Sequence, residues 1–190
     1  MTADLPDTAL WELAGAGDGE AFGQLFDRHS RAVYNHCFRL TASWSVAEDL
    51  TSTTFLLAWR QRDRLRPVND SLRPWLLAVA TNAVRSHRRS TGRRLRLAAR
   101  VPAEPPVADH AEDVAGRVDD ERRMAAVLTE LRRLPRAQQE AVALCLWSGL
   151  SYAEAAAALG IAEVTVRSHI SRARSRLRAA LVPILTEEIS

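Results

Sequence analysis

The apolar residues of this sequence recur at helical intervals along most of its length. From Leu72 onward they fall three or four residues apart, which places them on one face of a helix. Trp75 belongs to this stripe and is expected in the core, and Pro74 lies in the first turn, where its missing N–H leaves no hydrogen bond unmade. The same spacing predicts helices over residues 21–40 and 46–59, and no segment alternates in the manner of a strand.

Two stretches interrupt the helical pattern. Residues 60–71 contain Pro67 and Asn69 and are predicted to form a loop. The prolines and acidic residues between about 98 and 118 have no apolar partners at helical spacing, which indicates a flexible linker. We therefore predict an all-α protein with two small helical domains joined by this linker. The first domain, the linker and the second domain cover residues 1–97, 98–118 and 119–185.

The second domain contains a well-defined sequence of helix signals. A helix over residues 136–147 is expected to end at Gly149, because glycine adopts the left-handed conformation that ends many helices. Ser151 and Glu154 have the spacing of a capping box, in which each side chain bonds the other residue's backbone N–H. Gly160 then permits a sharp turn, and a basic helix with an apolar stripe follows.

Two short helices joined by a glycine turn, with arginines on the second, match the helix-turn-helix unit. In that unit the N-terminal half of the second helix enters the major groove. Arg167 and Arg172 are the expected guanine readers, because a guanidinium fork matches O6 and N7 of guanine. Thr165, Ser168 and Ser171 are short enough to let the helix approach closely, and Arg174 and Arg176 suit phosphates. Tyr152 is also assigned to this DNA surface.

The distribution of charge indicates more than its total. The 190 residues carry a formal charge of +3, and all 26 basic residues are arginine. Arginines are concentrated in residues 60–100 and in the final helix, whereas residues 104–121 are acidic. Two basic blocks separated by an acidic segment indicate two DNA-facing surfaces. The sequence has no apolar run of roughly 18 residues and no signal-peptide pattern, so we expect no membrane insertion and a cytoplasmic location.

Other chemistry finds little support in the sequence. Cys37 and Cys145 lie in apolar helical patterns and are expected to be reduced core thiols. His29, His36 and Cys37 have no familiar ligand spacing, so we expect no metal and no other cofactor. The glycine-rich segment 15–19 follows no strand and precedes no phosphate-binding lysine. With no recognisable catalytic set, we expect that the protein is not an enzyme.

Several segments resemble one known family. Leu-Ser-Tyr-Ala-Glu at 150–154 and the residues at 165–174 closely resemble the C-terminal domain of extracytoplasmic-function (ECF) sigma factors of the sigma-70 family. Residues 17–22 are similar to that family's opening helix, and residues 47–60 to the segment that docks on the polymerase clamp. Pro-Trp-Leu and the arginines within residues 74–94 resemble the helix that opens and reads the −10 element.

The resemblance implies a sigma factor that binds core RNA polymerase and promoter DNA. Its region 2 would melt and read the −10 element, its region 4 would read the −35 element, and an anti-sigma factor is a further partner that the family implies. The residues assigned to the −10 element are Asn69, Asp70, Ser71, Asn82, Arg85, Arg88, Arg89 and Arg93. Those assigned to the polymerase clamp are Glu48, Asp49, Leu50 and Phe55.

A stand-alone helix-turn-helix regulator is the alternative. It explains the C-terminal half equally well, but it does not explain the second basic block at residues 85–94. A gel-shift assay separates the two functions. A regulator binds duplex promoter alone, whereas a sigma factor binds detectably only together with core polymerase.

Overall fold

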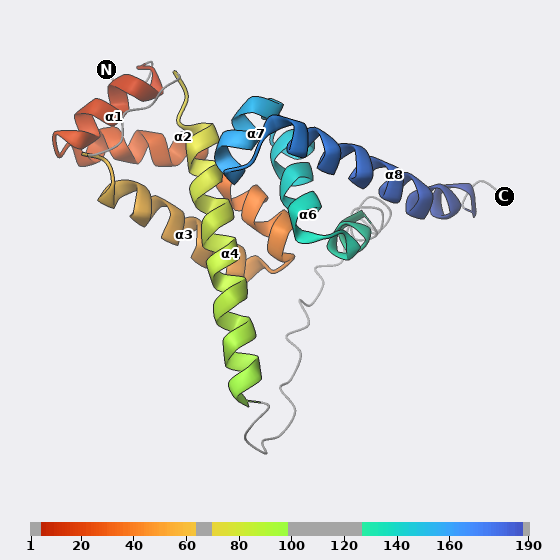
Figure 1. The fold of residues 1–190 in the computed structure, drawn as a ribbon. Coiled ribbons are helices and arrows are strands. Elements are labelled where there is room, and N and C mark those ends of the chain that lie inside the picture. The colour runs from red at the N-terminus through yellow and green to blue at the C-terminus, as the bar shows by residue number, and fades with distance from the viewer. Residues whose placement is uncertain (1–4, 64–69, 99–126, 188–190) are drawn as a thin grey trace.

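Helices make up all the regular structure of residues 5–63, 70–98 and 127–187, the part of the chain that the computed structural model describes (Figure 1). The all-α prediction is confirmed. The labelled helices are α1 (Asp7–Gly15), α2 (Gly19–Thr41), α3 (Trp44–Arg60), α4 (Arg73–Ala98), α6 (Arg136–Val142), η1 (Ala143–Trp147), α7 (Tyr152–Leu159) and α8 (Glu163–Glu187). A further short helix over residues 127–133 precedes α6. The predicted linker lies outside the described residues, apart from its first position, where α4 ends.

Helices α1 to α4 form the N-terminal domain, in which α2 contacts each of the other three. Helix α2 begins after Asp18, whose carboxylate accepts hydrogen bonds from two backbone N–H groups at 2.9 and 3.1 Å. It ends at Thr41, and the next residue, Ala42, has the left-handed φ of 53°. Helices α2 and α3 correspond to the helices predicted over residues 21–40 and 46–59, and each begins two residues earlier and ends one residue later. Trp75 is half-buried against this core, its ring 5.3 Å from that of Trp11.

Helix α1 is held in place by a buried carboxylate that the sequence pattern did not reveal. Asp7 is only 3% exposed, and it accepts hydrogen bonds from Arg28 and His29 on α2, each at 2.6 Å. It also accepts one from the backbone N–H of Leu72 at 2.8 Å. One side chain therefore ties together α1, α2 and the residue that precedes α4.

The C-terminal domain has the turns that the sequence predicts. The Ser151 hydroxyl accepts from the backbone N–H of Glu154 at 3.2 Å, and the Glu154 carboxylate accepts from the Ser151 backbone N–H at 2.8 Å. Gly149 and Gly160 have φ values of 71° and 68°, as the two sharp turns require. The apolar stripe of α8 is buried against α6 and α7, with Val166 among its members.

The predicted helix over residues 136–147 is correct in extent but not in form. Its last turn, η1, is wider than an α-helix, because the backbone N–H of Ser148 bonds the carbonyl of Ala143 five residues earlier, at 3.1 Å. Two neighbouring residues of this turn enter different cores. Ala143 is buried in the core of the N-terminal domain, and Leu144 is buried in the core of the C-terminal domain.

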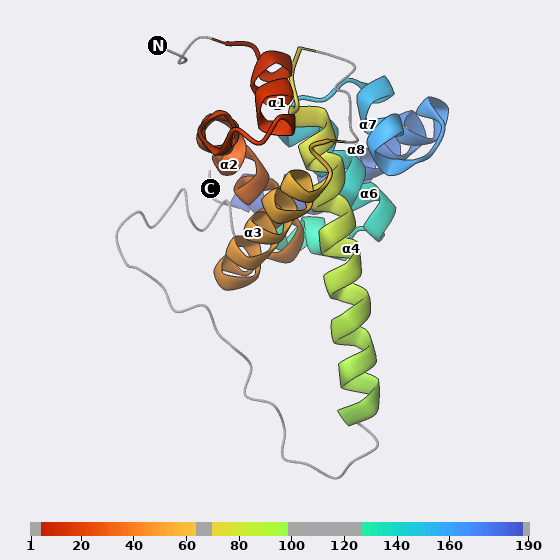
Figure 2. The ribbon, with the colours of Figure 1, turned by 90° about the vertical axis from the view of Figure 1, so that its left-hand side faces the viewer.

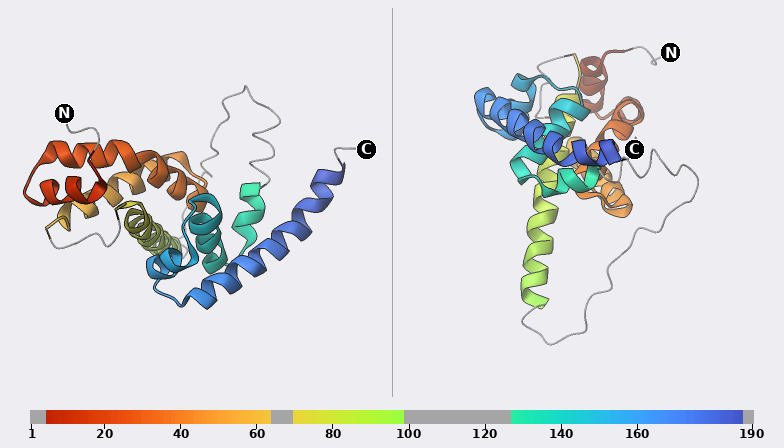
Figure 3. Two further views of the ribbon diagram at one scale, coloured as in Figure 1. Left: turned by 90° about the horizontal axis from the view of Figure 1, so that it is seen from above. Right: turned by 90° about the vertical axis from the view of Figure 1, so that its right-hand side faces the viewer.

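The two domains pack against each other along α4. Leu77 of α4 is fully buried among the core residues of the C-terminal domain, and α4 contacts α7 extensively. The views in Figures 2 and 3 agree that α6 and α7 lie beside the first half of α4. The second half of α4 projects away from both domains, and α8 extends in another direction toward the C-terminus (Figures 1 and 3).

Candidate nucleic-acid interface

The projecting half of α4 presents arginines to solvent. Arg89 and Arg93 are exposed there, as predicted for phosphate-binding residues, and Arg94 and Arg96 are exposed as well. This part of α4 stands away from the body of the protein (Figure 1). Exposed arginines along a free helix suit an extended phosphate backbone.

A groove of about 520 Å³ lies between α3 and the part of α4 that precedes these arginines. Its apolar lining includes Leu50, Trp75 and Ala83, and its polar lining includes Thr53 and Asn82. The predicted −10 residue Asn82 is exposed and lies on this groove. An apolar floor with amide and hydroxyl groups at its edge suits a nucleobase that has left the stack, because a base is flat, apolar on its faces and polar at its edge.

The segment before α4 is described only in part. Asp70 and Ser71 are exposed, and the Ser71 hydroxyl accepts from the backbone N–H of Arg73 at 3.2 Å. Asn69 lies outside the described residues. The Asp7 carboxylate bonds the backbone of Leu72, the next residue, so it fixes the point from which this segment departs.

Two of the predicted −10 arginines are half-buried and contact the C-terminal domain. Arg85 donates to both carboxylate oxygens of Glu140, at 3.0 and 2.6 Å, and its pKa is raised chiefly by these hydrogen bonds. Arg88 donates to the backbone carbonyl of Leu40 and, at 3.1 Å, to the Gln139 side chain. The structure therefore separates the predicted set into exposed arginines and arginines engaged between the domains.

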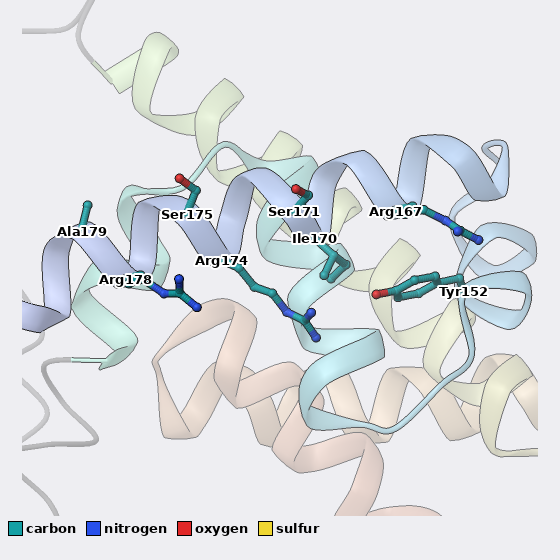
Figure 4. Close-up of a pocket in the computed structure, with 8 residues that line it drawn as sticks. All are labelled: Tyr152, Arg167, Ile170, Ser171, Arg174, Ser175, Arg178 and Ala179. Carbon is teal, nitrogen blue, oxygen red and sulfur yellow. The ribbon is translucent and has the colours of Figure 1, made fainter.

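The helix-turn-helix is formed by α7 and α8, and its polar residues fall on two strips of α8. With about 100° of rotation per residue, Arg167, Ser171 and Arg174 share one strip. This strip borders Tyr152 and lines a groove of about 690 Å³ (Figure 4). Figure 4 shows Arg174 and Arg178 pointing to the same side of α8. The second strip consists of Thr165, Ser168, Arg172 and Arg176.

Arg178 and Ser175 line the same groove and were not among the predicted residues. Arg178 lies four residues after Arg174, so helical spacing was the signal that could have identified it. Arg167 is exposed but is not free, since it pairs with Glu163 at 3.1 Å and lies 5.7 Å from the Tyr152 ring. Arg172 and Arg176 are exposed on the other strip.

The residues assigned to the polymerase clamp divide according to burial. Glu48 and Asp49 are exposed on α3. Leu50 and Phe55 are 6% and 4% exposed and belong to the core, so they hold α3 in place and present little surface to a partner. Leu56 on α3 and Phe26 on α2 are exposed apolar residues nearby, and the Phe26 ring centroid lies 4.7 Å from that of Phe55. Neither was among the residues assigned to the clamp, although Leu56 lies within the segment that resembles the docking motif.

Comparison with known proteins identifies the family. Residues 25–94 match the Sigma-70 region 2 model, and residues 124–177 match Sigma-70, region 4. The chain is 35% identical to the RNA polymerase sigma factor NccH of Alcaligenes xylosoxydans xylosoxydans, over 95% of this chain and 97% of NccH. It is 36% identical to the ECF RNA polymerase sigma factor SigM of Mycobacterium tuberculosis, over 92% and 84% of the two chains. The chain belongs to the ECF sigma factors.

A solved structure agrees with this assignment. The sigma factor RpoE of Bartonella quintana, determined in complex with the anti-sigma factor NepR, is 31% identical and superposes with a TM-score of 0.67, over 84% of this chain and 96% of RpoE. As a sigma factor, the protein binds core RNA polymerase and directs it to promoters, where transcription starts. The N-terminal and C-terminal domains carry region 2 and region 4, respectively.

In the described part of the chain, no group of histidine, cysteine and acidic side chains is arranged to hold a metal ion. His36 is fully buried and bonds Thr81 at 2.8 Å, and burial lowers its pKa to about 3. Within those same residues, no helix is long and apolar enough to cross a membrane.

Proposed function

We propose that this sigma factor reads its promoter with two separate surfaces. The region 2 domain binds the −10 element through α4 and the groove beside it, and the region 4 domain binds the −35 element through α8. The observation that supports this division is the occurrence of exposed arginines on two helices of different domains, the projecting half of α4 and the outer face of α8. A protein with a single DNA-binding surface would not need exposed arginines on both helices.

On the region 2 side, we propose that the groove between α3 and α4 receives an extruded base of the −10 element. Asn82 reads its polar edge, and Asp70 and Ser71, with Asn69, border the point of entry. Arg89 and Arg93 hold the adjacent phosphates, joined by Arg85 and Arg88 when these are released from the region 4 domain. Opening a base pair costs a few kcal/mol, and contacts to the extruded base offset part of that cost.

On the region 4 side, the two strips of α8 have different proposed roles. Arg172, with Thr165 and Ser168, reads base edges, because short neighbours let the helix approach the groove closely. Ser171, Arg174 and Arg176 contact the phosphates that flank the site, and Arg178 joins them. Arg167 reads a guanine after exchanging Glu163 for the base, and Tyr152 supports it from α7.

The remaining assignments are also proposals. Glu48 and Asp49 contact the polymerase clamp, while Leu50 and Phe55 position their helix. The region 2 domain spans residues 1–97, the linker 98–118 and the region 4 domain 119–185. The complex of RpoE with NepR supports an anti-sigma partner for this chain too. We place its activity in the cytoplasm, with RNA polymerase, and assign it no catalytic reaction.

Site-specific photo-crosslinking tests the division between the two surfaces. A crosslinking amino acid replaces Arg93 on α4 or Arg176 on α8, and each variant is assembled with core polymerase on a promoter labelled at defined positions. The proposal expects crosslinks from Arg93 to the −10 region and from Arg176 to the −35 region. Crosslinks from both positions to one element, or from Arg93 to no DNA, would overturn it.

A further inference from the structure

The interface between the two domains uses residues that the promoter also needs. Leu77, Arg85 and Arg88 are spaced by eight and three residues and therefore lie on one face of α4. This face is turned toward the region 4 domain, where Leu77 is fully buried in that domain's core. In the opposite direction, Ala143 of η1 is fully buried in the region 2 core. Apolar burial thus joins the two domains from both sides.

A charged pair crosses the same interface. Glu140 is 4% exposed, and both of its oxygens accept from the Arg85 guanidinium, at 3.0 and 2.6 Å. A buried carboxylate is stable only when it is paired, so Glu140 favours the packed arrangement as long as Arg85 is its partner. A bidentate contact of this kind is also the one by which arginine binds a phosphate.

Two further arginines support the contact. Arg39 of α2 donates to the backbone carbonyl of Trp147 at 3.5 Å, and its guanidinium lies 5.2 Å from the Trp147 ring centroid. Arg88 bonds Gln139, but its Nη1 is buried without a hydrogen-bond partner. The pKa of Arg88 is lowered chiefly by burial and further by the positive charge of Arg136. The interface therefore holds more arginine than Glu140 can neutralise, which leaves it open to competition by an anion.

We infer that the free sigma factor is held in a closed, autoinhibited state in which Glu140 of region 4 occupies the Arg85 guanidinium that binds a phosphate of the −10 strand. This inference rests on the proposed function of α4. Closing also fixes the position of α8 relative to α4, so the two DNA-binding helices cannot move independently to two promoter elements. Assembly with core polymerase separates the domains, and Arg85 and Arg88 then become available to DNA.

The test uses the full chain and the variant Glu140→Gln, which removes the charge and keeps the size of the side chain. The matched control is Glu130→Gln, whose carboxylate pairs with Arg133 within the region 4 domain, at 2.5 Å. Fluorescent labels on cysteines placed at the exposed positions Ser45 and Ala157 report the separation of the domains by energy transfer. All labelled proteins also carry Cys145→Ser, because Cys145 is a half-buried free thiol that could react with the label. Cys37 stays unlabelled, because it is fully buried and burial raises its pKa to about 12.

A fluorescent single-stranded −10 oligonucleotide, added without core polymerase, reports access to α4. If about one molecule in ten of the wild type is open, releasing the closed state lowers the apparent Kd about tenfold. We expect Glu140→Gln to show lower energy transfer and this gain in affinity, and Glu130→Gln to match the wild type. The charge-exchanged double variant, Arg85→Glu with Glu140→Arg, should regain the energy transfer that Arg85→Glu alone loses.

Each outcome decides the inference. Unchanged energy transfer in folded Glu140→Gln would overturn it, and so would opening without a gain in affinity, because Glu140 would then not compete with DNA. If Glu140→Arg does not fold, the single variant alone decides. The proposed function fails separately, when wild-type protein with core polymerase gives no transcript from a promoter that has both elements.

Discussion

Replacing Asp7 with asparagine should destabilise the region 2 domain well beyond the effect of an average surface substitution. The ionised carboxylate accepts three hydrogen bonds, from Arg28, His29 and the backbone of Leu72, at 2.6 to 2.8 Å, and it is 3% exposed. Hydrogen bonds to a charged group contribute about 1.5–3 kcal/mol each, and they are not additive within one cluster. The bonds from His29 and Leu72 share one carboxylate oxygen, so an asparagine amide oxygen in its place can keep these two, as weaker bonds to a neutral acceptor, while the NH2 group then faces the Arg28 guanidinium. We expect a loss of about 3 kcal/mol at neutral pH.

The destabilisation caused by Asp7→Asn should also depend on pH. Burial alone would raise the pKa of Asp7, but the hydrogen bonds from Leu72 and Arg28 and the interaction with His29 outweigh it and hold the pKa below its usual value of 3.8. A lowered folded-state pKa stabilises the protein above 3.8, and the contribution is lost as pH falls through the folded pKa. The difference between wild type and Asp7→Asn should therefore shrink below about pH 4.

Urea denaturation followed by circular dichroism measures both effects. Asp27→Asn is the control, because it removes an exposed carboxylate from the same helix that carries Arg28 and His29. The control should change the unfolding free energy by less than about 0.5 kcal/mol. A loss at neutral pH below about 1 kcal/mol for Asp7→Asn, or a difference that stays constant down to about pH 3, would refute the reasoning.

The remaining predictions concern DNA contacts and one turn. Arg172→Ala should weaken recognition of the −35 element by about 1–3 kcal/mol without changing core binding, measured by transcription from promoters that differ only in that element; equal loss of core binding would contradict the role. Arg93→Ala should reduce the salt slope of −10 oligonucleotide binding by about 1, and an unchanged slope would show that Arg93 contacts no phosphate. Gly160→Ala should destabilise the protein by about 1–2 kcal/mol in urea, because φ is 68° there. Gly23→Ala, in the second turn of α2 with open space around it, should not.

The sequence was sufficient to predict the features that depend on neighbours along the chain. Helix spacing, the Ser151–Glu154 capping box and the left-handed glycines are set by residues within one or two turns of each other, and the structure confirms them. The exposed arginines of α8 follow from the same periodicity. For that reason the helix-turn-helix was predictable almost residue by residue.

Features that depend on distant residues were not predictable in this way. Asp7 bonds residues 21, 22 and 65 positions later, and no local pattern announces such a cluster. The pairing of Arg85 with Glu140 spans 55 positions, so nothing in the local sequence indicated it, and the family resemblance assigned the arginine to DNA alone. One feature of the sequence did point to the interface between the domains. Leu77 is an apolar residue outside the predicted stripe of α4, which indicates that a second part of the protein covers that helix.

Run-off transcription with purified core polymerase tests the central claim most directly. The template set consists of one promoter with both elements intact, one with an altered −10 element and one with an altered −35 element, at equal spacing. We expect a discrete transcript from the intact promoter only, dependent on this protein, and a loss of that transcript when either element is changed. A transcript that is insensitive to the −10 element, or one that requires no added protein, would contradict it.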